Sequence, residues 1–216
     1  MPIPGIFCAA AGIIPPNVIF VGSAEATSSA SGGISVNKPT GMLTGDILVA
    51  LLAAEDAATW AGPGSFTWTI VANQGVAPSL CVMVRTVAAG ENASATFTHG
   101  VSTDNVGQIH CIRGVQYDAI GTIATRTDNG DLVIGGITSN GGLIFAASAT
   151  SGDPFAAHST PSGMLMIDNT NNSNGVGLTS FRQRVDTGAT GTRTSTVSAV
   201  GVSDPSAGVV IGLKPA

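Results

Sequence analysis

Residues 64–70 read Gly-Ser-Phe-Thr-Trp-Thr-Ile, and this pattern indicates the fold class. Large apolar side chains at Phe66, Trp68 and Ile70 alternate with threonines. Successive side chains of a β-strand point to opposite faces, so a period of two places the three large side chains on one face. The stretch therefore predicts a strand that is buried on one side.

Short apolar runs continue along the chain at intervals of about ten residues, with Gly, Asn, Asp or Pro in the gaps. No longer stretch carries the apolar stripe of a helix. The pattern predicts an all-β fold, an antiparallel β-sandwich or barrel, and we favour a jelly-roll-like sandwich. Segments 26–33 and 168–177, rich in Ser/Gly and in Asn, are predicted to be loops. The expected core contains Phe66, Trp68, Val82, Phe97, Ile109, Val209 and Ile211.

The composition excludes several classes of protein. Only 10% of the 216 residues are charged and 44% are hydrophobic, which disfavours a coiled coil, a helical bundle or a disordered chain. Eight Lys and Arg against 13 Asp and Glu leave no basic surface for nucleic acid. The longest apolar run, 47–54, is far shorter than the roughly 20 residues of a membrane-spanning helix. We therefore expect neither a nucleic-acid nor a membrane partner.

The N-terminal segment has an unusual composition, because residues 1–24 carry no charged side chain. A solvated tail of this kind would be an exposed apolar patch, which soluble proteins avoid. The segment either forms the first strand of the core or binds a partner, and both can hold in different parts. We expect an extended arm over residues 1–25 and a β-sandwich domain over 26–216. The arm residues predicted to lie against another chain are Ile3, Ile6, Phe7, Ile13, Ile14, Val18, Ile19 and Phe20.

Catalytic and metal-binding motifs are missing from the sequence. His99, His110 and His158 have no metal-ligand spacing, so we expect no metal and no other cofactor. The sequence has neither a Gly-x-Ser-x-Gly elbow nor a P-loop. Glu55-Asp56 is the only adjacent acidic pair, and strand neighbours point to opposite faces, so we expect no enzyme activity. Residues 128–131, Asp-Asn-Gly-Asp, favour a hairpin turn over a calcium loop.

The cysteines indicate where the protein is made. Cys8, Cys81 and Cys111 form no CxxC pair and are odd in number. This usage predicts reduced, buried thiols in a protein made in a cytosol.

Four residues are candidates for contact with a partner or a glycan. Trp60 and Tyr117 lie next to turn residues, where an aromatic ring is able to stack on a sugar. Arg182 and Arg184 share one face of a predicted strand, opposite Phe181, and suit acidic groups on a partner. The alternative for the arginines is an ordinary solvated face.

Several stretches resemble a family of β-sandwich domains in virion proteins of tailed bacteriophages. Residues 41–50, Gly-Met-Leu-Thr-Gly-Asp-Ile-Leu-Val-Ala, are similar to a strand of that family that begins with Gly-Asp. Segments 64–70, 84–91 and 109–115 resemble three further strands, and 209–215 resembles the last one. The resemblance covers about residues 30 to 216. It implies a place on the virion, where such domains serve as head decoration (cement) proteins or as tail and fibre modules.

These observations lead to one expected function and one alternative. The expectation is a structural virion protein that decorates a phage head, contacting itself as a homotrimer and the phage major capsid protein. It would be made in the bacterial host cytoplasm and reside on the particle surface. The alternative is a lectin-like receptor-binding or tail module, with the Asn-dense segment, Trp60 and Tyr117 as its glycan site.

Overall fold

The computed structural model describes residues 17–127, 131–152, 158–172, 175–196 and 204–216. Within these ranges all regular elements are β-strands, which confirms the all-β prediction. The strands are β1 (Ile19–Asn37), β2 (Ile47–Ala54), β3 (Thr69–Gln74), β4 (Ser79–Thr86), β5 (Ser94–Arg113), β6 (Val115–Ile120), β7 (Ala124–Arg126), β8 (Asp131–Ile134), β9 (Thr138–Ser151), β10 (Leu165–Asn172), β11 (Val176–Ala189), β12 (Arg193–Thr196) and β13 (Ser206–Pro215).

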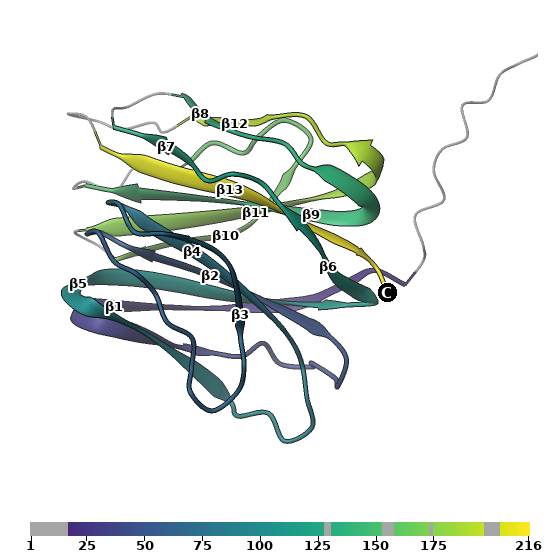
Figure 1. Ribbon diagram of the computed structural model, residues 1–216, viewed down its shortest axis with the longest axis horizontal. Coiled ribbons are helices and arrows are strands. Elements are labelled where there is room, and N and C mark those ends of the chain that lie inside the picture. The colour runs from purple at the N-terminus through teal and green to yellow at the C-terminus, as the bar shows by residue number, and fades with distance from the viewer. Residues whose placement is uncertain (1–16, 128–130, 153–157, 173–174, 197–203) are drawn as a thin grey trace, which may run out of the picture.

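Two antiparallel sheets form a sandwich (Figure 1). The first has the order β1-β5-β2-β4-β3, and the second has the order β10-β11-β9-β13-β6, with β7 also paired to β13. Strands β8 and β12 pair separately. The first five strands thus build one sheet, and all later strands except β8 and β12 build the other. The sandwich prediction is confirmed, whereas the finer expectation of a jelly roll is not.

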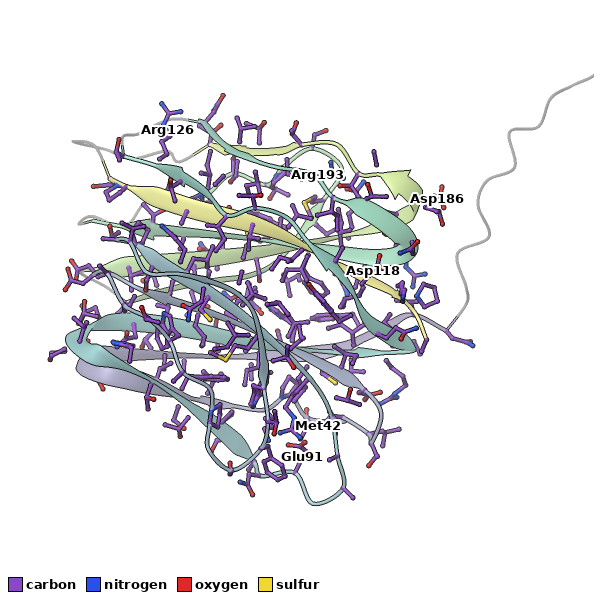
Figure 2. All side chains as sticks on the ribbon, viewed as in Figure 1. Met42, Glu91, Asp118, Arg126, Asp186 and Arg193 are labelled. Carbon is purple, nitrogen blue, oxygen red and sulfur yellow. The ribbon has the colours of Figure 1, made fainter. Side chains whose placement is uncertain are left out.

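Apolar side chains cover both faces of each sheet. Side chains fill the space between the two sheets (Figure 2). This inner cluster includes Val49 and Phe145. A second cluster, with Leu48 and Trp60, lies on the outer face of the first sheet. A third, with Ile144, lies on the outer face of the second sheet beneath β8. Neighbouring residues of β2 and of β9 therefore enter different clusters, which explains why these strands are apolar at nearly every position.

Strands β1 and β5 belong to the first sheet, but they are long and bend. One part of each strand therefore covers the outer face of that same sheet. The pairing register of β1 with β5 shifts between Ser28 and Gly33, and Ala30 has φ 47°. A Cβ atom at Gly33 would lie 2.3 Å from the carbonyl oxygen of Phe97, so only glycine fits. The predicted loop at 26–33 is therefore wrong, because its small residues mark a bend within a strand.

The N-terminal segment is described only in part. Strand β1 begins at Ile19, so residues 19–25 of the predicted arm pair with β5. For residues 19–25 the alternative of a first core strand is therefore correct. Val18 is 2% exposed and belongs to the inner cluster of its own chain, so the expectation that it lies against another chain is wrong. Ile3, Ile6, Phe7, Ile13 and Ile14 lie outside the described residues.

Most of the predicted core is buried, namely Trp68, Val82, Phe97, Ile109, Val209 and Ile211. Phe66 is only half-buried, and Ile70 is 45% exposed. The alternation did not hold here because the strand begins at Thr69, after a turn. Cys81 and Cys111 are buried and free, as predicted, whereas Cys8 lies outside the described residues. Burial raises the pKa of the Cys81 thiol to about 12, and burial and then the Asp46 carboxylate raise that of Cys111 to about 12.

A two-pronged ion pair joins the start of β2 to the end of β5. Arg113 donates from Nε and Nη2 to the two carboxylate oxygens of Asp46, each at 2.9 Å. The backbone N–H of Leu43 donates to the same carboxylate at 2.8 Å. Burial acts to raise the pKa of Asp46, but these donors and the Arg113 charge outweigh it, and the pKa is lowered.

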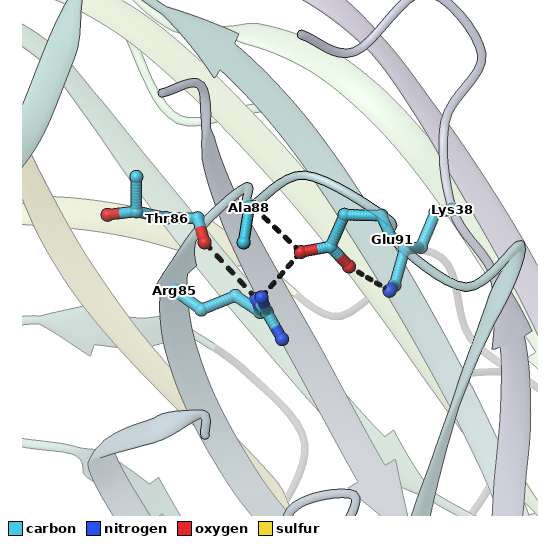
Figure 3. A network of polar contacts seen from close by, with 5 residues as sticks. All are labelled: Lys38, Arg85, Thr86, Ala88 and Glu91. Atoms are coloured by element: carbon cyan, nitrogen blue, oxygen red, sulfur yellow. Dashed lines mark hydrogen bonds and ion pairs between the residues drawn. The ribbon is translucent and has the colours of Figure 1, made fainter. Parts of the chain in front are cut away.

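A second charged network closes the loop after β4 (Figure 3). Glu91 accepts from Lys38 Nζ, from Arg85 Nη2 and from the N–H of Ala88. Both cations lie over the ring of Phe66, at 5.2 Å for Lys38 and 4.6 Å for Arg85. Burial acts to raise the pKa of Glu91, but the Ala88 N–H and the two cations outweigh it and lower the pKa.

Replacing Glu91 with Gln leaves Lys38 and Arg85 buried without a carboxylate. We expect the free energy of unfolding at pH 7 to fall by about 3 kcal/mol, because breaking a buried ion pair leaves uncompensated charge. The folded-state pKa of Glu91 is lowered, so its stabilising effect is present above the ordinary pKa of 4.5 and is lost as the pH falls further. Urea denaturation at pH 7 and at pH 3 measures both effects.

Glu55→Gln is the matched control. Burial, then Asp56 and Asp104, raise the pKa of Glu55, so its charge opposes folding at pH 7. This variant is expected to be at least as stable as the wild type at pH 7. A Glu91→Gln protein as stable as the wild type, or a difference that widens in acid, would contradict the network.

Candidate functional site

A cleft of about 430 Å³ opens at the mouth of the sandwich, where the start of β1 faces β10 and β11. It brings together two sets of residues that the sequence predicted separately, the arm residues Val18 and Phe20 and the arginines Arg182 and Arg184. The remaining lining residues are Leu143, Gly163, Leu165 and Gln183.

The arginines reach the cleft because of the alternation along β11. Leu178 belongs to the inner cluster, and every second residue after it faces the same way, through Ser180 to Arg182 and Arg184. Phe181 points to the opposite face and is fully buried in the third cluster, on the outer face of the second sheet. The prediction that both arginines share one face, opposite Phe181, is therefore confirmed. The inward-facing side chains of β11 therefore change from apolar to cationic where the inner cluster ends.

Each guanidinium has a fixed neighbour on β1 or just before it. The Arg182 guanidinium lies over the ring of Phe20, 4.3 Å from its centroid. Arg184 donates from Nη2 to the carbonyl oxygen of Val18 at 2.7 Å. Partial burial, and then the charge of Arg184, lower the pKa of Arg182. Within the described ranges neither arginine forms an ion pair with a carboxylate.

Aromatic rings and a buried histidine lie behind Phe20. His110 is fully buried and stacks on Phe145, with ring centroids 5.5 Å apart. Burial, and then the Arg182 charge, lower the pKa of His110 to about 3, so the ring is neutral. Asp168 Oδ2 lies 3.6 Å from His110 Nδ1, and this contact is not an ion pair because the imidazole is uncharged.

Exposed apolar side chains lie around the place where the N-terminal segment joins β1. Ile19 is 48% exposed, and Leu165 and Met166 at the start of β10 are 66% and 43% exposed. The sequence reasoning did not find Leu165 and Met166 as site residues. Their signal is the unbroken apolar run 164–167, since a strand with one solvated face would alternate.

Trp60 is not available to a ligand, and its prediction as a contact residue is wrong. It is 2% exposed, donates from Nε1 to Ser79 Oγ, and meets His99 edge-on at 4.4 Å. Its loop covers the outer face of the first sheet, which needs a large side chain there. Tyr117 is half-buried against the inner cluster on β6 and does not line the cleft.

The Asn-dense segment is also not the predicted loop. Residues 168–172 belong to β10, and Asn172 is buried. The Asn172 amide donates to the carbonyl oxygen of Ser28, and the hydroxyl of Thr170 donates to Glu25. These side chains tie β10 to β1. Of the turn at 128–131, only Asp131 lies within the described residues.

Other clusters give little chemistry. Among the described residues no group of three or more His, Cys, Asp or Glu side chains is arranged to hold a metal ion. Within the same residues there is no helix of the length and apolarity needed to cross a membrane. Glu55 and Asp104 both lie near Gly175, away from the residues that line the cleft.

Comparison with protein-family models, with curated proteins and with solved structures finds no match to this chain. The resemblance to phage virion proteins therefore stays a prediction. The cleft, with its paired arginines and apolar surroundings, is the candidate functional site.

The proximity of Arg182 to His110 has a measurable consequence. Arg182→Gln removes a neighbouring positive charge, so the pKa of His110 is expected to rise from about 3 by about half a unit. His158, whose pKa of about 4 results from burial, is the internal control and should not move. NMR titration of the imidazole signals between pH 7 and acid unfolding measures both. A wild-type His110 that titrates near pH 6.5 would contradict this arrangement.

Proposed function

We propose that this chain is a structural protein of a tailed-bacteriophage particle, a head decoration or cement protein that strengthens the shell through contacts between subunits. The observation that carries the proposal is the uncharged segment 1–24 and the place where it joins the sandwich. Val18 and Phe20 line a cleft, and Leu165 and Met166 beside it leave apolar surface exposed.

The physical basis of the proposal is burial of apolar surface. Burying apolar surface on association contributes a favourable free energy of about 25 cal/mol per Å². An apolar arm therefore strengthens an interface without added charge. The prolines at positions 2, 4, 15 and 16 favour an extended chain that lies along a groove. We expect the partners to be further copies of this chain, as a homotrimer, and the phage major capsid protein.

We expect no enzyme activity, and we expect the protein to reside on the particle surface after synthesis in the host cytoplasm. Glu55 and Asp56 follow β2 directly, and Glu55 is half-buried whereas Asp56 is exposed. The alternative, a glycan-binding tail module, has less support. Its expected site consisted of Trp60, Tyr117 and the Asn-dense segment. Trp60 is buried, Tyr117 is half-buried, and Asn172 is hydrogen-bonded within the sandwich.

Deleting residues 1–16 tests the role of the arm while leaving β1 whole. We expect the truncated protein to keep its β-sheet circular dichroism and to lose association with itself and with undecorated heads. Analytical ultracentrifugation and a head-binding assay measure the two effects.

A second variant separates composition from length. Replacing Ile6, Phe7, Ile13 and Ile14 with Ser keeps the arm but removes apolar area, and it should weaken association as the deletion does. Undiminished association of either variant would overturn the cement function. A truncated protein that instead binds a bacterial surface glycan would favour the tail-module alternative.

A further inference from the structure

We propose that Arg182 and Arg184 form a binding site for the carboxylate of an acidic protein segment, held in the cleft at the mouth of the sandwich. This inference rests on the proposed function only where it takes a protein, and not another molecule, as the source of the carboxylate. The geometry of the cleft carries the rest.

The two positive charges lack compensation. Arg182 and Arg184 lie two residues apart on one face of β11, and no described carboxylate is paired with either. Asp186, next on the same face, forms no ion pair with Arg184. Residues 1–16 contain no Asp or Glu, so the chain's own arm cannot supply the counter-charge. A carboxylate from another molecule would offset the repulsion between the two guanidinium charges.

The donors are held in position before any ligand binds. Arg182 stacks on Phe20 and has no hydrogen-bond acceptor among the described residues, so its N–H groups are free to bind. Arg184 uses one Nη2 hydrogen on Val18 and keeps its other donors. A guanidinium binds a carboxylate through two parallel hydrogen bonds, and a fixed guanidinium loses less conformational entropy on binding.

The walls favour a peptide over a sugar. Val18, Leu143 and Leu165 are apolar, which suits an acidic residue with apolar neighbours. Sugars bind by stacking on an open aromatic face, and one face of the Phe20 ring is covered by the Arg182 guanidinium. A volume of about 430 Å³ accommodates one acidic side chain and parts of its neighbours.

NMR of the arginine Nε–Hε groups, with the full chain and the probe peptide acetyl-Leu-Asp-Leu-amide, tests the proposal. We expect saturable shifts of the Arg182 and Arg184 signals. The matched peptide acetyl-Leu-Asn-Leu-amide, which lacks the charge, is expected to bind about tenfold more weakly or worse. Equal binding of the two peptides, or no shift of either arginine, would overturn the site.

Variants localise the binding. Arg182→Gln and Arg184→Gln should each weaken the Asp peptide by about tenfold. Arg182→Lys keeps the charge but loses the planar guanidinium that makes two parallel hydrogen bonds. Its affinity for the Asp peptide should lie between those of the Gln variants and the wild type. Arg126→Gln, on β7 and outside the cleft, is the control and should bind as the wild type does. The backbone amide spectrum shows whether each variant is folded, and peptide binding undiminished in a folded Arg182→Gln protein would contradict the assignment.

Two further probes define the ligand class. N-acetylneuraminate or inorganic phosphate binding more tightly than the Asp peptide would overturn the peptide assignment in favour of an acidic glycan or a phosphate. The protein lacking residues 1–16 separates this inference from the cement function. It should keep its affinity for the peptide even where it no longer associates, because the arm supplies no carboxylate. Loss of peptide binding on that deletion would contradict the site.

Discussion

The sandwich depends on one constraint, that each sheet must bury both of its faces. Neighbouring residues of β2, such as Leu48 and Val49, enter clusters on opposite sides of the sheet. The bent part of β1 and β5 covers one outer face, and the β8–β12 pair covers the other. The fit is close, since a Cβ atom at Gly208 would lie 2.8 Å from Leu132 and Ile134. Exposed apolar side chains (Ile19, Leu165 and Met166) and the arginines Arg182 and Arg184 lie together at the mouth of the sandwich.

The sequence predicted what depends on neighbours along the chain. Strand alternation placed Arg182 opposite Phe181, because side-chain direction in a strand follows local geometry. Trp68 is buried as predicted, but it precedes β3, so its burial does not follow from strand alternation. The sequence could not predict which loop covers an outer face, so Trp60, beside a turn, looked accessible although it fills the second cluster. It also could not bring Phe20 to Arg182, since that contact joins strands from distant parts of the chain.

The motifs behind the phage resemblance have structural explanations in this fold. Asp46 and Arg113, from two separate motifs, form one ion pair, and Arg85 and Glu91, from a third, form another. Each pair ties a loop to a strand of the first sheet. These residues therefore bear on folding, while the candidate function depends on the arm and on the cleft beside Val18.

We propose that association takes place at the mouth of the sandwich. Amide hydrogen exchange, compared between dilute and associated protein, tests it most directly. We expect association to slow exchange in residues 17–25, 163–168 and 181–185 and to leave exchange in β8 and β12 unchanged. Slowing confined to β8 and β12, with unchanged exchange around the cleft, would contradict it.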